Sequence, residues 1–299
     1  MKYEKKPTTF EEQADMLLSR GLVADREELL KRLNSVSYYR LSGYLYPFRR
    51  PGAEQYYEGT SLKVIWNHYC FDRRLRVLVL DAIERIEVSA RTKLVHHFSH
   101  AHGPFGYLDD QNLPHLKIDE YLEWRTNLVE ETHRSKETFA KHFFTIYGDC
   151  HKELPVWMLA EVMSMGSTLT FFKGVDQSIQ RKIAAEYGLA DELFRSWFRS
   201  LNAARNICAH HSRFWNRELG YKPDLPQKNK FPAWHGESKL KNSRSGIILM
   251  ICRHMLALIT PTSQWSGRVE SLFAEYPDIP LQDMGLPHDW KVHPVWTQT

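Results

Sequence analysis

Cysteine is scarce in this chain and widely spread. The 299 residues contain four cysteines, Cys70, Cys150, Cys208 and Cys252, and no two of them form a Cys-x-x-Cys pair. That spacing excludes a zinc ribbon and a thioredoxin-type redox site, and the low number is typical of a reducing cytosol. The glycine-rich patterns GxxxxGK[ST] and GxGxxG are also absent. We therefore expect no nucleotide-hydrolysing P-loop and no cofactor.

Long apolar runs are missing as well. The longest apolar stretch, residues 246–260, is interrupted by Arg253 and His254 and is too short to cross a bilayer. The N-terminal residues contain no apolar segment of the kind that signal peptides carry. We therefore expect a cytoplasmic protein with no membrane partner.

Neither sign of charge is in large excess. Lys and Arg number 40 and Asp and Glu number 36, which gives a net charge of +4. Such a small excess does not by itself indicate a nucleic-acid partner. Residues 193–244, however, contain 11 Lys or Arg and 3 Asp or Glu, a local net charge of +8. The near-balanced total conceals one basic segment, and an RNA partner is expected there.

Helical periodicity dominates the pattern, and alternating strand patterns are scarce, so we expect an all-α fold. The strongest signal covers residues 61–101, where apolar residues recur at spacings of three and four and form one buried stripe. The members of this stripe are Leu75, Leu78, Val79, Ala82, Ile83, Ile86, Ala90 and Leu94. Two N-terminal helices are predicted from capping signals, Thr9 with Glu12 and Asp25 with Glu28.

The remaining chain divides into shorter helices and connections. Further helices are predicted at about 117–147, from Pro155 onward, and at about 176–187, 191–211, 244–259 and 266–275. Residues 35–60 are rich in Tyr, Gly and Pro and are predicted to be an ordered aromatic connector. Trp157 and Trp197 are expected in the core. We divide the chain into an N-terminal segment, 1–60, a helical domain, 61–276, and a C-terminal tail, 277–299.

The segment at 191–217, DELFRSWFRSLNAARNICAHHSRFWNR, has two unlike faces when it is wound as a helix. The apolar face carries Trp197, Leu201, Ala204 and Cys208. The opposite side carries Asn202, Arg205, Asn206 and His210, and Arg213 would join it if the helix continued.

The groups on this polar side suit chemistry on an RNA phosphodiester. A guanidinium is a permanently charged fork of donors that matches phosphate oxygens, and an imidazole takes or gives a proton near neutral pH. Arg205 and His210 are therefore candidate catalytic residues for attack of a 2′-hydroxyl on its phosphate. Asn206 is placed to orient the imidazole or a phosphate oxygen. The other interpretation is a solvated helix face whose final histidine interacts favourably with the helix dipole.

The residues around this pair resemble a known family. The run LNAARNICAHHSRFWNR resembles the signature of the Abi-like family, abortive-infection phage-resistance proteins of the AbiD and AbiF type. Other stretches resemble the same family in order along the chain. They are SYYRLSGYLYPF at 37–48, AIERIEVSARTKL at 82–94, HGPFGY at 102–107, LPVWMLAEVMSMGSTLTFF at 154–172 and MGLPHDW at 284–290.

This resemblance implies a HEPN-like helical bundle over 61–276 and a metal-independent endoribonuclease, acting in phage defence or as a toxin. Such enzymes carry an R-x4-6-H motif and usually pair two motifs across a dimer, so a homodimer is implied, with RNA as the other partner. On this chain the motif falls on Arg205, which would stabilise charge at phosphorus, and on His210, which would transfer protons. The implied products end in a 2′,3′-cyclic phosphate and a 5′-hydroxyl. The supporting or RNA-contacting candidates are His211, a rival for the role of His210, and Asn202, Arg213, Arg217 and Arg199.

Arg91 with His96 or His97 is a candidate second motif, which would let one chain pair two motifs. The alternative is an ordinary helix ion pair between Glu87 and Arg91, which lie four residues apart. Glu84 and Glu87 are either orienting groups for a neighbouring helix or part of a solvated face.

A histidine cluster raises the question of a metal site. His96 and His100 lie four residues apart and His102 is close in sequence, but neither an H-E-x-x-H motif nor a cysteine partner accompanies them. We expect no metal.

The aromatic connector leaves a second question open. Its rings alternate with Arg40, Arg49 and Arg50, which fits stacking on unpaired bases as well as burial in a core. The rings are Tyr38, Tyr39, Tyr44, Tyr46 and Phe48. Besides a ribonuclease, the chain fits a non-catalytic binder of a structured small RNA, or a protein-interaction scaffold with no RNA affinity.

Overall fold

The computed structural model describes the chain except residues 1, 3, 5, 237 and 298–299, and the described part is all-α, as expected. It contains no strand, only three isolated bridges. The helices are α1 Phe10–Ser19, α2 Arg26–Val36, α3 Tyr38–Leu45, α4 Leu62–His102, α5 Ile118–Arg134, α6 Thr138–Tyr147, α7 Val156–Val162, α8 Met165–Gly174, α9 Gln177–Ala185, α10 Asp191–Ala209, α11 Gly246–Ile259 and α12 Trp265–Glu275. In the described part of the chain, none of these helices has the length and apolarity needed to cross a bilayer.

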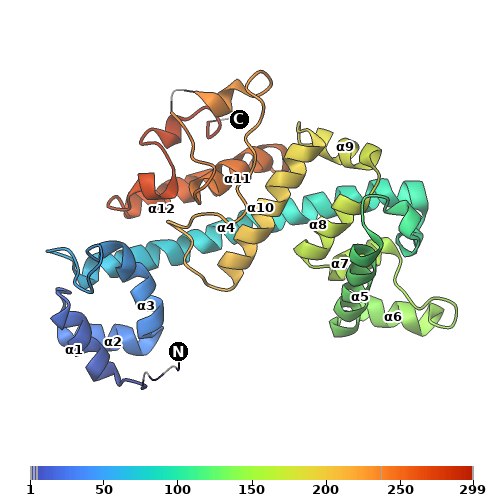
Figure 1. Ribbon diagram of the computed structural model, residues 1–299. Coiled ribbons are helices and arrows are strands. Elements are labelled where there is room, and N and C mark those ends of the chain that lie inside the picture. Colours follow the sequence, from blue (N-terminus) through green and yellow to red (C-terminus); the bar gives the residue numbers. More distant parts are fainter. Residues whose placement is uncertain (1, 3, 5, 237, 298–299) are drawn as a thin grey trace.

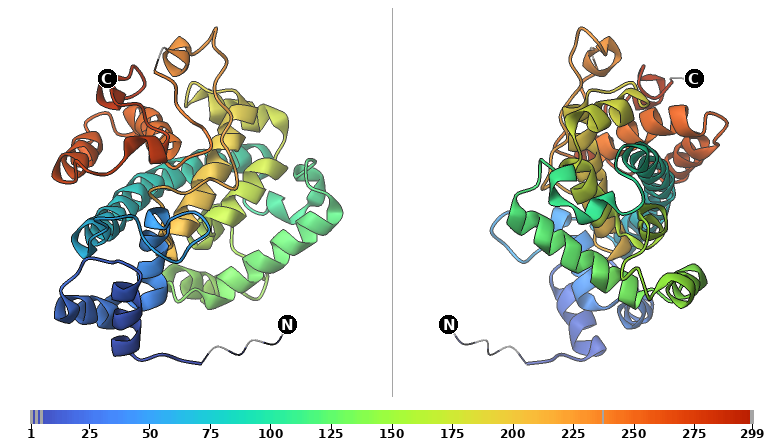
Figure 2. Two further views of the ribbon diagram at one scale, coloured as in Figure 1. Left: turned by 60° about the vertical axis from the view of Figure 1, so that its left-hand side comes forward. Right: turned by 90° about the vertical axis from the view of Figure 1, so that its right-hand side faces the viewer.

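The 41-residue helix α4 is the axis of the molecule (Figure 1). Its predicted apolar stripe is confirmed, with all members buried except the partly buried Leu78. Helices α1 to α3 lie at the N-terminal end of α4, α5 to α8 lie near its C-terminal end, and α10 crosses it between them. The further views in Figure 2 place α11 and α12 on the opposite side of α4 from α5 and α6.

Both N-terminal start signals are confirmed. The Thr9 hydroxyl accepts from the Glu12 amide at 3.2 Å, and the Glu12 carboxylate accepts from the Thr9 amide at 2.8 Å. The Asp25 carboxylate accepts from the Glu28 amide at 2.8 Å. These caps satisfy amide groups that lack partners within the helix.

Two expected elements differ from the structure. The connector 35–60 contains helix α3, whose first turn is capped by Ser37, and apolar content alone does not reveal such a short helix. The single helix expected over 117–147 is two helices, because Ser135 turns to an extended conformation and its hydroxyl accepts from the Glu137 amide. The helix expected from Pro155 is α7, which begins at Val156 and ends at Val162, and Ser164 caps the next helix, α8.

The two tryptophans expected in the core differ in burial. Trp197 is fully buried, and its indole N–H donates to the Asp224 carbonyl at 2.9 Å. Trp157 is 47% exposed, so its assignment to the core is wrong. It lies on helix α7, whose buried residues are Val156, Leu159 and Ala160.

The segment expected to form a tail packs tightly where the structure describes it, through Thr297. Trp290 and Trp296 are buried, with ring centroids 4.6 Å apart. The Trp296 indole N–H donates to Glu270 at 2.7 Å, which fixes the segment to α12.

Candidate functional site

Helix α10 has the two faces expected of it. Its apolar face is buried against the body of the protein, as predicted for Trp197, Leu201, Ala204 and Cys208. Asn206 and His210 are exposed, and Asn202 and Arg205 are half-exposed. The polar groups of the Arg205–His210 motif are therefore open to solvent at the C-terminal end of a rigidly packed helix.

The backbone fixes where this helix ends. The His211 amide donates to the Cys208 carbonyl and the Ser212 amide to the Ile207 carbonyl, both at 3.0 Å. This pattern is a Schellman motif, and it places His211 at a left-handed φ of 57° that normally favours glycine. Helix α10 therefore cannot continue through Arg213. That side chain turns away from the motif and donates to the Gly43 carbonyl of α3.

A buried carboxylate holds the chain that follows the motif. Asp72 of α4 is fully buried and accepts from the amides of Phe214 at 3.1 Å and Trp215 at 2.8 Å. It also pairs with Arg76 and accepts from the Tyr44 hydroxyl at 2.6 Å. Burial raises the pKa of the Asp72 carboxyl, although Arg76 and these donors favour its charged form. This network fastens the end of α10 to α3 and α4.

Arg205 keeps its guanidinium available. In the described part of the chain it forms no ion pair, and its one hydrogen bond goes to the Asn206 side-chain oxygen at 3.2 Å. Nearby, Glu87 of α4 has a side chain only 14% exposed. Burial raises the pKa of Glu87, and the charges of Arg91 and Arg205 act against that rise. Glu87 therefore lies within the electrostatic reach of Arg205.

In the second pattern, no hydrogen bond joins Arg91 to His96 in the described part of the chain, and each has other neighbours. Arg91 pairs with Glu87, the ion pair considered from the sequence, and donates to the Met163 carbonyl at 3.0 Å. His96 is exposed, and its ring lies 4.3 Å from the His100 ring. His97 instead contacts Glu186 at 2.8 Å. Among the described residues, no group of three or more His, Cys, Asp or Glu side chains is arranged to hold a metal ion.

The other candidates on and after α10 have separate surroundings. The Arg199 guanidinium stacks over the Tyr221 ring at 3.8 Å and lines a pocket of about 780 Å³ between α8 and α10. Asn202 lies close to Gly166 at the start of α8. A side chain placed at Gly166 would have its Cβ atom 4.0 Å from the Asn202 side-chain nitrogen. Burial lowers the pKa of Arg213, and the positive charge of the exposed Arg217 adds to that lowering. Arg199 and Asn202 therefore lie along α10, and Arg217 lies in the loop that follows it.

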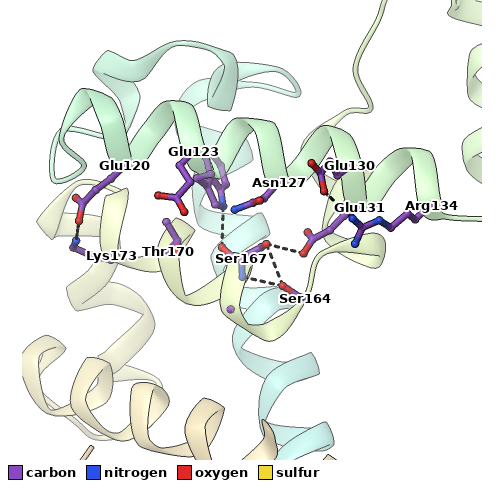
Figure 3. A pocket seen from close by; sticks show the side chains of 12 residues that line it. Glu120, Glu123, Asn127, Glu130, Glu131, Arg134, Ser164, Ser167, Thr170 and Lys173 are labelled. Carbon is purple, nitrogen blue, oxygen red and sulfur yellow. Dashed lines mark hydrogen bonds and ion pairs between the residues drawn. The ribbon is translucent and has the colours of Figure 1, made fainter. Parts of the chain in front are cut away.

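The groove between α5 and α8 has a different character (Figure 3). Its volume is about 410 Å³, and four glutamates line it, Glu120, Glu123, Glu130 and Glu131. Lys173 pairs with Glu120, and Ser167 donates to Glu131 at 2.9 Å. The excess of carboxylates makes this groove unsuitable for a phosphate.

Sequence reasoning missed the residues that hold the motif in place. Asp72 and Arg76 lie seven residues before the buried Val79 and Ile83, so the helical period puts both charges on the apolar stripe. Two charged residues at positions expected to be buried were the signal from which the sequence could have revealed this network. Arg40, which donates to the His211 carbonyl at 2.6 Å, gave no such signal, because the contact joins residues 171 positions apart.

Comparison with known proteins gives one match. The family model described as Abi-like protein matches residues 31–216, more than half of the chain, from α2 to the loop after α10. No curated protein and no solved structure matches the chain.

Proposed function

The chain belongs to the Abi-like family, which implies a role in abortive-infection phage defence, and from this premise we propose that it is an endoribonuclease of the HEPN type. The observation that carries the proposal is the Arg205 guanidinium, which has no ion-pair partner among the described residues, five positions before an exposed His210 on a helix end that α3 and α4 hold in place. Most other arginines of α4 and α10 have a carboxylate or ring partner, as Arg91 and Arg199 do.

The proposed reaction is transfer of an RNA phosphodiester to its own 2′-hydroxyl. The 2′-oxygen bonds to phosphorus while a histidine accepts its proton, and the bond from phosphorus to the 5′-oxygen breaks as that oxygen gains a proton. Arg205 stabilises the negative charge that develops on the phosphoryl oxygens. The products are a 2′,3′-cyclic phosphate and a 5′-hydroxyl, and no step requires a metal ion or cofactor.

A single motif supplies one histidine, whereas the reaction needs both a proton acceptor and a proton donor. A second copy of the chain supplies the other histidine in the proposed homodimer. Val77 and Val88 of α4 are 60% and 49% exposed and lie three helical turns apart on one face. Val88 directly follows Glu87, whose pKa is raised by burial and lowered in part by the charges of Arg91 and Arg205. Asp81 and Glu84 lie between Val77 and Val88 on the same face, so the two valines are separate apolar positions. The homodimer itself is proposed from the family, whose enzymes usually pair two motifs across a two-fold axis.

The test is cleavage of labelled RNA in the presence of EDTA, with analysis of the product ends. We expect cyclic phosphate ends from the wild type, and a loss of about 10²- to 10⁴-fold in kcat/KM for His210→Ala or Arg205→Ala. Matched controls are His142→Ala in α6 and Arg181→Ala in α9, both exposed. If His210→Ala cleaves as fast as wild type, the role given to His210 is wrong. Intact RNA with salt-sensitive binding would identify a non-catalytic binder instead.

A further inference from the structure

A second basic site adjoins the motif on the side that faces α3. The end of α10 and the N-terminal half of α4 meet α3 around a pocket of about 430 Å³. Its polar lining includes Arg40 from α3, Tyr69, Arg73 and Arg76 from α4, and His211. No acidic residue lines it.

The arginines of this pocket differ in whether a carboxylate balances their charge. Arg76 is balanced by the buried Asp72 behind it. Arg73 is exposed and forms no ion pair with any described residue, and Arg40 makes its one side-chain hydrogen bond to a neutral carbonyl, that of His211. The Cys208 thiol also lines the pocket, but burial raises its pKa to about 12, so it stays uncharged. Two positive charges therefore face the cavity with no counter-charge.

Other arginines of α4 show the contrast. Arg74, next to Arg73, pairs with Glu275, and Arg85 pairs with Asp81. An arginine without a carboxylate partner keeps its planar fork of donors for an incoming anion, and that fork matches phosphate oxygens in particular. The pocket therefore has the charge and the donors of a phosphate site.

Its position ties this site to the motif. His211 directly follows His210, and Cα atoms of consecutive residues lie about 3.8 Å apart. The exposed ring of Tyr39, 88% accessible, precedes Arg40 on α3, and Tyr46, 68% accessible, follows at the end of the same helix. Exposed aromatic rings beside a basic groove are suited to stacking of unpaired bases.

We propose that the pocket between α3, α4 and the end of α10 binds a backbone phosphate of single-stranded RNA, next to the phosphate held at Arg205 and His210. The inference rests on the proposed ribonuclease function. The RNA-binding surface then includes α3, and the bound strand runs from the end of α10 toward the N-terminal helices.

The test measures binding of labelled single-stranded RNA to the full chain over a series of salt concentrations. All proteins carry His210→Ala so that the RNA stays intact. We expect the further change Arg73→Gln to weaken binding by about tenfold, as for loss of a charged hydrogen bond. The slope of log Kd against log salt should fall by about 0.7, the value for one phosphate contact on a single strand. The matched control is Arg134→Gln on α5, which removes the same charge from a remote, 78% exposed side chain.

The outcomes separate this inference from the proposed function. If Arg73→Gln changes neither the Kd for RNA nor its salt slope while the wild type cleaves RNA, the phosphate site alone is overturned. Absence of cleavage with an Arg73-dependent Kd would overturn the ribonuclease and leave the site standing. If adenosine monophosphate binds more tightly than RNA, and Arg73→Gln loses this binding, the pocket is a site for a free nucleotide. That result would overturn the RNA subsite. A raised KM with kcat retained, for Arg73→Gln in the otherwise wild-type enzyme, would support the proposal.

Discussion

At the scale of single residues, two adjacent histidines have different backbones. His210 has a φ of −83° and terminates α10, whereas His211 has a φ of 57°, which is unfavourable for a residue with a Cβ atom. The motif spacing from Arg205 admits either histidine. The structure separates them, because His211 lines the pocket toward α3 and its carbonyl is held by Arg40.

This difference predicts opposite effects of glycine at the two positions. His211→Gly removes the left-handed strain and should raise the free energy of unfolding by about 1 kcal/mol, measured by urea denaturation. Its kcat for RNA should stay near wild type, because His210 remains. His210→Gly gains no such relief and should lose kcat. An equal loss of kcat in both variants would show that His211 takes part in the chemistry.

At the scale of elements, the junction of α4 with the end of α10 depends on a buried ion pair. Asp72 and Arg76 lie one turn apart, inside the stripe that packs α4, and both are nearly inaccessible. Burying charges costs desolvation energy, which their attraction and hydrogen bonds offset. A hydrophobic pair would pack there as well, but it would not hold the amides of Phe214 and Trp215.

Stability and activity should therefore separate at this pair. Asp72→Ala leaves the Arg76 charge buried without a partner and should cost about 3–5 kcal/mol of unfolding free energy. The double variant Asp72→Leu/Arg76→Met should recover part of that loss but not the rate of RNA cleavage, because the loop after α10 stays unanchored. Breaking the exposed pair with Arg74→Ala, the control, should cost about 1 kcal/mol or less. Full recovery of cleavage in the double variant would contradict a positioning role for Asp72.

The same elements show how far the sequence predicts the structure. The stripe of α4 and the two faces of α10 follow from local periodicity, which is strong over long helices. The break at Ser135 and the short helix α3 depend on single capping hydroxyls, so periodicity does not reveal them. The contacts of Arg40 and Arg213 with distant backbone carbonyls follow only from the tertiary arrangement.

At the scale of the whole molecule, one chain carries one motif with a free arginine. The candidate second motif is internally paired, since Arg91 is bound to Glu87 and the Met163 carbonyl. A single chain would then have one histidine for two proton transfers. Val77 and Val88 are exposed apolar positions of α4 at which self-association about a two-fold axis can be tested.

Mixing experiments test whether the active unit is a pair of chains. Wild type is mixed with His210→Ala at constant total concentration, with time for exchange. If both motifs are needed, random pairing leaves about a quarter of the activity in an equal mixture, whereas independent chains would leave about half. Adding Val88→Asp to the inactive chain should remove its interference, because a carboxylate in place of this exposed apolar side chain opposes pairing. Light scattering should then show that chain as a monomer. Activity that falls in simple proportion to the wild-type fraction would exclude a site shared between two copies. The catalytic acid and base would then have to come from one chain, and His211 would be the nearest candidate for the second proton transfer.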